Sequence, residues 1–223
     1  HPHALGSIPV NGTVSGADRA GAAATAAGLV ERGFTCLKVK VGLGDDAGRL
    51  AAIRAAVGPD VLLRVDANGA WYSPAEALAN LRALVPSDLE LAEEPVSGVE
   101  ALAAVSADSP VPISMDETAD DVAGFGSGAT DLVCLKISRC GGITGLLRAA
   151  TVARAAGSEV YVASALDGPL GVAAAVHAAA ALGAEAPLRH CGLATLELFE
   201  GGEDAALPVT RGSIAVPAGP GLL

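Results

Sequence analysis

Aromatic side chains are scarce in this chain of 223 residues, at 3%, and basic side chains are few as well. The 14 Lys and Arg residues are outnumbered by 25 Asp and Glu residues, which gives a formal net charge of −11 at pH 7. Nucleic acids and anionic membranes attract proteins through a surplus of Lys and Arg, so neither is expected as the main partner. A small anionic substrate is not excluded, because such a ligand responds to local charge.

The sequence also lacks paired cysteines and a long hydrophobic run. The apolar stretch at 171–182 is interrupted by His177. It falls short of the about 18–20 residues that a membrane-spanning helix needs. The four cysteines are scattered and form no CxxC pair. We therefore expect a protein of the reducing cytoplasm, without a disulfide framework.

Glycine-rich phosphate-binding motifs are missing too. No GxGxxG follows the first β-rich run and no GxxxxGKS occurs, which removes the usual reasons to expect an open, doubly wound sheet. Short β-rich runs instead alternate with longer amphipathic ones. The predicted strands are 8–14, 35–41, 61–66, 89–93, 112–116, 131–136, 159–163 and 188–191. Seven helical stretches separate these eight strands, so we expect an α/β barrel whose last helix is missing or replaced; the open sheet is the alternative.

The same pattern predicts how the chain is divided. Residues 8–196 would form the barrel. Residues 1–7 would be a linker or remnant, and 197–223 a tail, punctuated by Pro and Gly, that packs on the barrel.

Ionisable residues stand at the ends of five successive predicted strands. The second to sixth strands end in Lys40, Asp66, Glu93, Asp116 and Lys136. The carboxyl ends of parallel barrel strands open onto one mouth, where active sites of this fold lie. Three carboxylates there would repel one another, and a divalent cation that prefers oxygen ligands, such as Mg²⁺, would relieve the repulsion.

The lysines complete a chemical hypothesis. A cation that holds a substrate carboxylate makes the adjacent C–H bond more acidic, and a neutral lysine can take the proton. Lys38 lies two residues before Lys40, on the same side of the strand, so its charge would favour the neutral form of Lys40. Lys136, on the opposite side of the mouth, could stabilise negative charge or return a proton.

Each of these residues has an ordinary structural interpretation when taken alone. Lys38 and Lys40 could lie on a half-exposed strand, Asp66 and Asp116 could cap turns or helices, and Lys136 could extend from a strand end into solvent. The ordered series, one strand apart each time, is difficult to produce by chance and favours a functional site.

The series Lys-x-Lys, Asp-x-Asn, Glu-Glu-Pro, Asp-Glu-Thr, Lys resembles the enolase superfamily in its muconate-lactonizing subgroup, from the first strand to about Leu196. The resemblance implies a (β/α)7β barrel that binds one Mg²⁺ and a small carboxylate substrate. It implies specific roles as well: metal ligands Asp66, Glu93 and Asp116; base Lys40 with its neighbour Lys38; opposite lysine Lys136; and supporting residues Asn68, Glu117 and Arg64.

Within that subgroup, the segments 64–71, 164–171 and 191–195 resemble the o-succinylbenzoate synthases of menaquinone biosynthesis. This likeness implies a lyase that carries out the syn dehydration of a cyclohexadiene carboxylate. The backbone of Ser164, Ala165 and Leu166 would then contact substrate. N-succinylamino acid racemase, dipeptide epimerase and muconate cycloisomerase remain alternatives with the same lysines and ligands, and a non-catalytic truncated barrel is the alternative of another class.

Two further expectations concern the mouth. Family members carry an N-terminal α+β capping domain over it, and nothing before Ile8 could supply one, so we expect the cap to be missing or much reduced. His190 ends the eighth predicted strand and could also reach the mouth.

Overall fold

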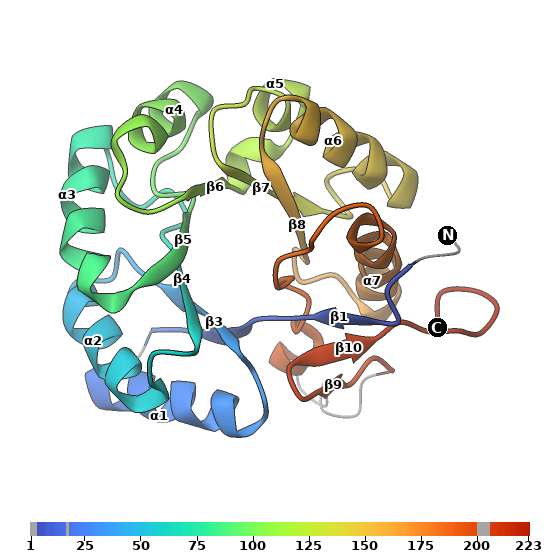
Figure 1. Cartoon of the computed structure of the whole chain (residues 1–223), viewed down its shortest axis with the longest axis horizontal. Helices are drawn as coiled ribbons and strands as arrows, with labels where there is room; N and C mark the ends of the chain where they lie inside the picture. Colours follow the sequence, from blue (N-terminus) through green and yellow to red (C-terminus); the bar gives the residue numbers. More distant parts are fainter. Residues whose placement is uncertain (1–3, 17, 200–205) are drawn as a thin grey trace.

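The computed structural model describes residues 4–16, 18–199 and 206–223, and its centre is a curled sheet of seven parallel strands (Figure 1). The strands pair in chain order: β2 (Gly12–Val14), β3 (Cys36–Lys40), β4 (Leu62–Asp66), β5 (Leu89–Glu93), β6 (Ile113–Met115), β7 (Leu132–Lys136) and β8 (Glu159–Ala163). A helix follows each strand and lies outside the sheet: α1 (Arg19–Glu31), α2 (Asp46–Val57), α3 (Pro74–Leu84), α4 (Val99–Asp108), α5 (Val122–Phe125), α6 (Ile143–Ala155) and α7 (Pro169–Gly183). Single turns of 3₁₀ helix complete the order: η1 (Val85–Ser87), η2 (Glu117–Ala119) and η3 (Leu196–Leu198).

The segment around Cys191 occupies the eighth position of the barrel. Cys191 bridges Val10, and Gly192 bridges Ala163, both in parallel orientation. The backbone N–H of Asn11 donates to the carbonyl of Cys191 at 3.0 Å, and that of Gly192 donates to Val162 at 2.9 Å. The predicted (β/α) barrel is therefore confirmed and the open sheet is wrong, although the eighth strand consists of two isolated bridges rather than a continuous ladder.

The predicted first strand, 8–14, is in fact two strands. β1 (Ser7–Pro9) lies outside the barrel. It pairs antiparallel with β10 (Ser213–Ala215), which pairs in turn with β9 (Val209–Thr210). β2 then joins the barrel. The proposed boundary at 196 stays a prediction, and residues 1–3 and 200–205 of the predicted linker and tail lie outside the described residues.

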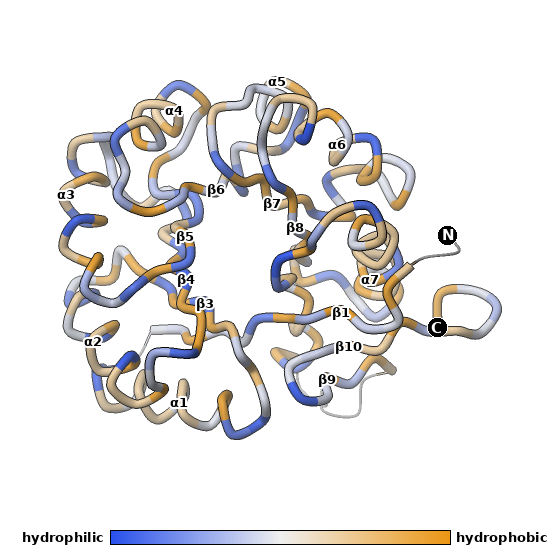
Figure 2. Tube along the Cα trace, viewed as in Figure 1, coloured by the Kyte–Doolittle hydropathy of each residue, from blue (hydrophilic) through white to orange (hydrophobic). Residues whose placement is uncertain are grey.

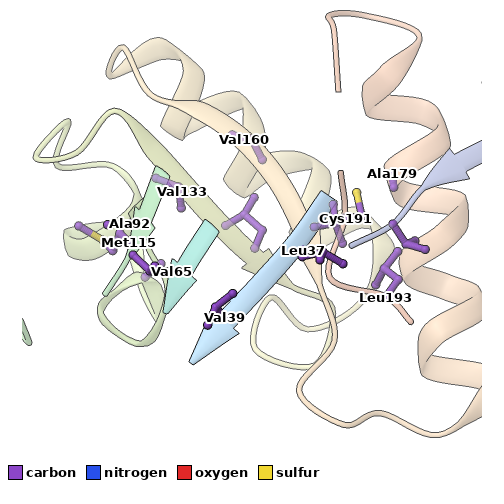
Figure 3. Close-up of a cluster of buried hydrophobic side chains, with 14 of the residues drawn as sticks. Leu37, Val39, Val65, Ala92, Met115, Val133, Val160, Ala179, Cys191 and Leu193 are labelled. Atoms are coloured by element: carbon purple, nitrogen blue, oxygen red, sulfur yellow. The ribbon is translucent and has the colours of Figure 1, made fainter. Parts of the chain in front are cut away.

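Successive side chains of the strands point alternately into two cores, one between the sheet and the helices and one inside the barrel. One set of side chains, which includes Val39, Val65, Met115 and Val133, faces outward and packs under the helices (Figure 3). The residues between them point into the barrel, where Leu91, Leu132, Cys134, Tyr161 and Ala163 form a separate apolar cluster. Because successive side chains of a strand point to opposite faces, the neighbours of outward Val39 and Val65, Lys40 and Asp66 among them, point inside.

Polar residues interrupt the apolar strands, so β4 and β5 carry both hydrophilic and hydrophobic residues (Figure 2). Arg64 and Asp66 on β4, Glu93 on β5 and Ser114 on the neighbouring β6 are all buried. A buried charge needs a partner, so these side chains must be paired within the barrel.

Among the described residues, no helix is long and apolar enough to cross a membrane.

Candidate active site

A cavity of about 420 Å³ opens at the carboxyl ends of the barrel strands. This is the end at which we predicted the site. Its lining includes nine of the twelve predicted site residues: Lys38, Lys40, Asp66, Asn68, Asp116, Lys136, Ser164, Ala165 and Leu166. Glu93 lies just below its floor, almost fully buried.

Lys38 and Lys40 both reach the carboxylate of Asp66. The strand register places Lys40 beside Asp66 on the next strand. The ammonium of Lys40 donates to Oδ2 of Asp66 at 2.5 Å, and that of Lys38 lies 2.8 Å from the same oxygen. Lys38 also donates to Oε1 of Glu93 at 2.6 Å, and therefore joins two of the predicted metal ligands.

On the other side of the cavity, Lys136 and Arg139 hold Asp116. Lys136 at the end of β7 donates to Oδ2 of Asp116 at 2.6 Å. Arg139, three residues later, lies 3.4 Å from the other oxygen of Asp116 and 3.1 Å from exposed Asp120. The cavity thus has one lysine–carboxylate pair on each side.

The left-handed backbone of Asn68 places its side chain against Lys40, the predicted base. Asn68 has a φ of 47°, in the left-handed region that few residues other than glycine adopt. In this conformation its Oδ1 accepts from the ammonium of Lys40 at 2.7 Å, and its Nδ2 donates to Oε1 of Glu117 at 2.9 Å. Asn68 therefore holds Lys40 directly and Glu117 holds Asn68, while the supporting roles of both residues stay predictions.

Glu94 fixes the loop that carries Asp116. Its carboxylate accepts from the backbone N–H of Asp116 at 2.7 Å and from the N–H and hydroxyl of Thr118. Glu94 is fully buried, also with a positive φ, of 41°. The second acid of the Glu-Glu-Pro motif is thus a structural support, and only Glu93 points into the barrel.

Electrostatics explain why the site would accept a cation. Burial raises the pKa of Asp116, and the nearby carboxylate of Glu93 raises it further. Burial would also raise the pKa of Glu93, but the ammonium of Lys38 and the hydrogen bonds with Asp116 and Tyr161 together outweigh it and lower this pKa. Two buried carboxylates this close repel one another, and a divalent cation would relieve that repulsion.

The donor set fits a hard cation. Single ligand atoms of Glu93, Asp116 and Cys134 lie within 4.8 Å of one another. Burial raises the pKa of Cys134 well above its ordinary value, so the thiol stays protonated and the carboxylate oxygens are the effective donors. Asp66 is outside this group and reaches it through Lys38, whose ammonium lies between Asp66 and Glu93. Oxygen donors of this kind suit Mg²⁺.

Lys38 and Lys136 keep their positive charge beside the carboxylates. Burial lowers the pKa of Lys38, but Glu93 and Asp66 outweigh it and the net pKa is raised. Burial would lower the pKa of Lys136 too, but the charge and the hydrogen bond of Asp116 contribute to a net rise. Lys38 lies beside Lys40 on the same carboxylate, and the role predicted for Lys38 stays a prediction.

Two sequence-based predictions place residues too near the mouth. Arg64 lies deeper in the barrel, where it pairs with Glu90 at 2.5 Å and donates to the carbonyl of His190 at 2.7 Å. It reaches the site only through Tyr161, whose ring lies 5.1 Å from its guanidinium. The prediction for His190 is wrong, because its ring contacts Thr35 at 3.0 Å, just before β3 begins and therefore at the opposite end of the barrel.

The predicted substrate contacts line the cavity, but part of their backbone is already engaged. The N–H of Ser164 donates to the carbonyl of Gly192 at 3.0 Å, and that of Ala165 donates to Asp167 at 3.1 Å. Leu166 has a φ of 61° and an exposed side chain. The role of these three residues stays a prediction, with the Leu166 side chain as the most accessible contact.

Sequence reasoning missed Tyr161, Cys134 and Arg139. Tyr161 donates to Oε2 of Glu93 at 2.7 Å from across the barrel. Tyr161 and Cys134 each stand two residues before the end of a strand, so the same alternation that identified Lys38 could have placed them inside. Arg139 follows Lys136 in the loop after β7, where spacing alone carries no signal.

A closed parallel barrel with carboxylates and lysines at its carboxyl-end mouth defines a (β/α)-barrel with a candidate metal site. The chain belongs to the enolase C-terminal domain-like family, which matches residues 21–222. It is 38% identical over 213 residues to the o-succinylbenzoate synthase of Thermobifida fusca, an alignment that covers 91% of this chain and 64% of the relative. The chain thus spans less than two thirds of that relative's length.

Solved structures agree with the fold. A dipeptide epimerase from Enterococcus faecalis, in complex with Mg and the dipeptide L-Leu-L-Tyr, superposes with a TM-score of 0.87 at 29% identity over 99% of this chain and 64% of its own. An N-succinyl Arg/Lys racemase from Bacillus cereus gives a TM-score of 0.87 at 27% identity over 98% of this chain and 60% of its own. The predicted superfamily is therefore confirmed, while the relatives differ in the reactions for which they are named.

Proposed function

We propose that this chain is the catalytic barrel of an o-succinylbenzoate synthase-like lyase, which uses Mg²⁺ to dehydrate a cyclohexadiene carboxylate. The observation that carries the proposal is that Lys40 and Lys136 line one cavity from opposite sides, each beside a carboxylate. The likeness to the Thermobifida fusca synthase supports this choice of reaction. The synthase assignment would place the chain in menaquinone biosynthesis and in the cytoplasm.

Asp66, Glu93 and Asp116 would hold the cation. When bound, Mg²⁺ would supply positive charge that stabilises a substrate carboxylate as the adjacent carbon loses its proton. The Lys38 ammonium lies against Asp66 and Glu93, so the cation would compete with it for those oxygens.

Lys40 is placed to do the proton transfer. Its Nζ is fixed by Asp66 and Asn68 at the edge of the cavity, so it would take the proton next to the substrate carboxylate. A syn dehydration removes the hydroxyl from the same face. The protonated Lys40 can then return its proton to the leaving hydroxyl, which departs as water. Lys136, on the opposite side, would face the anionic ring and balance its charge.

Racemisation or epimerisation is the second candidate. Two lysines on opposite sides of one cavity also suit a reaction in which one removes a proton and the other delivers one to the opposite face. The structural likeness to an epimerase and a racemase supports this alternative. The two candidates share every proposed catalytic residue, so they differ in substrate rather than in machinery.

The rim of the mouth supports a covering domain in the whole protein. Large apolar side chains are exposed in the segments after β3, β4 and β8: Leu43 at 60%, Tyr72 at 96% and Leu170 at 64%. Exposed apolar groups in several loops around one opening are candidates for an interaction surface. We therefore propose that a capping domain of the kind implied by the family covers this rim in the active protein.

The experiment is a substrate comparison with Mg²⁺ present, made on the whole protein with the proposed capping domain. The cyclohexadiene carboxylate would be followed by formation of the aromatic product, and N-succinylamino acids by loss of optical activity and by exchange of the α-proton in D₂O. The proposal expects dehydration that Lys40→Ala abolishes. Racemisation without dehydration would overturn the lyase assignment in favour of the second candidate. Neither product nor isotope exchange above the buffer rate would favour a non-catalytic barrel.

A further inference from the structure

Tyr161 is a buried polar side chain that the proposed reaction does not use. It lies in β8, and only 2% of its surface is exposed. Its hydroxyl donates to Oε2 of Glu93 at 2.7 Å and lies 2.9 Å from the hydroxyl of Ser114. A phenol has one proton, so the Tyr161 proton goes to Glu93 and Ser114 must donate to the phenol oxygen.

These contacts join three strands. Glu93 on β5 and Ser114 on β6 are neighbours in register. Tyr161 reaches them from β8, which lies across the barrel opening from β5 (Figure 1). The guanidinium of Arg64, 5.1 Å from the Tyr161 ring, packs against it from inside the barrel. The phenol is therefore held on several sides, and it fixes the torsion of the Glu93 carboxylate.

The two oxygens of Glu93 consequently have different environments. Oε2 is occupied by Tyr161, in a part of the barrel where Glu93, Ser114 and Tyr161 are all almost fully buried. Oε1 faces the ammonium of Lys38 at 2.6 Å, a cationic group that a metal ion could replace. Oε1 is therefore the oxygen that a metal ion reaches without competing with the phenol.

We propose that Tyr161 is a positioning residue that makes Glu93 a one-oxygen ligand and thereby favours Mg²⁺ over Ca²⁺. The proposal rests on the proposed metal site and goes beyond it. Mg²⁺ demands near-octahedral geometry, whereas Ca²⁺ accepts six to eight oxygens and readily binds both oxygens of one carboxylate. A phenol that occupies Oε2 denies Ca²⁺ the second oxygen at no cost to Mg²⁺.

The test is the binding of Mg²⁺ and of Ca²⁺, measured separately by isothermal titration calorimetry on the 223-residue chain and its variants. Tyr161→Phe keeps the ring and removes only the hydroxyl. We expect it to weaken Mg²⁺ binding by about 10- to 100-fold, the range typical for loss of a group that orients a metal ligand. Ca²⁺ binding should weaken less or improve, so that the ratio of the two dissociation constants shifts toward Ca²⁺.

Val162→Ala is the matched control. Val162 is fully buried on the same strand but belongs to the outer core, so its truncation should lower the thermal midpoint without changing the Mg²⁺ to Ca²⁺ ratio. Ser114→Ala removes the other partner of the phenol and should shift the ratio in the same direction as Tyr161→Phe, by about threefold, the size of one ordinary hydrogen bond. This second variant carries the test if Tyr161→Phe does not fold.

The outcomes separate the two proposals. A Tyr161→Phe protein that binds both ions with the unchanged ratio overturns the role of Tyr161 and leaves the metal site intact. If Tyr161→Phe does not fold, an unchanged ratio in Ser114→Ala overturns it equally. Absence of Mg²⁺ binding by the unmodified chain would overturn the metal site and the role of Tyr161 together.

Discussion

The ammonium groups of Lys38 and Lys40 share a single oxygen, Oδ2 of Asp66, at 2.8 and 2.5 Å. Glu93 takes part of the charge of Lys38, which eases the repulsion between the two ammonium groups. The arrangement concentrates positive charge at the edge of the cavity, where it would attract an anionic substrate.

Replacement of Lys40 tests the base. Lys40→Ala should reduce turnover by at least about 10²- to 10⁴-fold, the usual contribution of a positioned acid or base. Mg²⁺ affinity should not weaken, because the change removes a positive charge beside Asp66. Steady-state kinetics and calorimetry on the same preparation check both parts. Near-normal turnover would remove Lys40 from its role.

Replacement of Asp116 tests the metal ligands. Asp116→Asn keeps the shape of the side chain but removes the charge, so Mg²⁺ should bind at least about 10-fold more weakly. The thermal midpoint of the variant should also rise less on addition of Mg²⁺, since the stabilisation by a ligand grows with the ratio of its concentration to its dissociation constant. Asp120→Asn is the control, because Asp120 is exposed and contacts Arg139 rather than the cation site. Equal Mg²⁺ titrations for the two variants would contradict the assignment of Asp116.

The interior ion pairs predict how stability depends on pH. Burial would raise the pKa of Glu90, but its hydrogen bonds and ion pairs with Arg64 and Arg189 outweigh this and lower it. An acid whose pKa is lower in the folded state stabilises the fold above its unfolded pKa, about 4.3 for glutamate. That contribution is lost as the pH falls from there through the folded pKa.

Glu90→Gln should therefore lower the free energy of unfolding at pH 7 by about 3 kcal/mol, because it leaves the fully buried Arg64 without its carboxylate partner. Below about pH 4 the difference between the variant and the unmodified chain should shrink, and it should vanish once the pH is below the lowered pKa of Glu90. Urea unfolding at pH 7 and at pH 3 measures both differences. Glu159→Gln, at the exposed end of the same network, should have a much smaller effect. A deficit of Glu90→Gln that is constant with pH would show that its ionisation contributes nothing.

The barrel and its mouth could be predicted because both depend on local alternation. Period-two patterning placed Lys38 and Lys40 on one face, and the same rule placed Asp66 and Glu93 at neighbouring strand ends, where the register sets them side by side. A parallel barrel then brings the strand ends together whatever the details of the helices.

The remaining features depend on contacts between distant segments. The split of the first predicted strand follows from the pairing of β1 with β10, which is more than 200 residues away and leaves no local pattern. The depth of Arg64 depends on Glu90 and on the carbonyl of His190, which follows 126 residues later in the chain. Alternation along a strand predicts the face on which a side chain lies, but not which side chain across the barrel it contacts. The contact of Tyr161 with Glu93 could therefore not be predicted.

The most direct test of the account is a crystal structure of the chain grown with Mn²⁺ in place of Mg²⁺, in which anomalous scattering locates the ion. We expect one ion bound by oxygens of Asp66, Glu93 and Asp116, with the Lys38 ammonium displaced from Glu93. An ion held by Glu93, Asp116 and the Cys134 thiol without Asp66, or no ion at the mouth of the barrel, would contradict it.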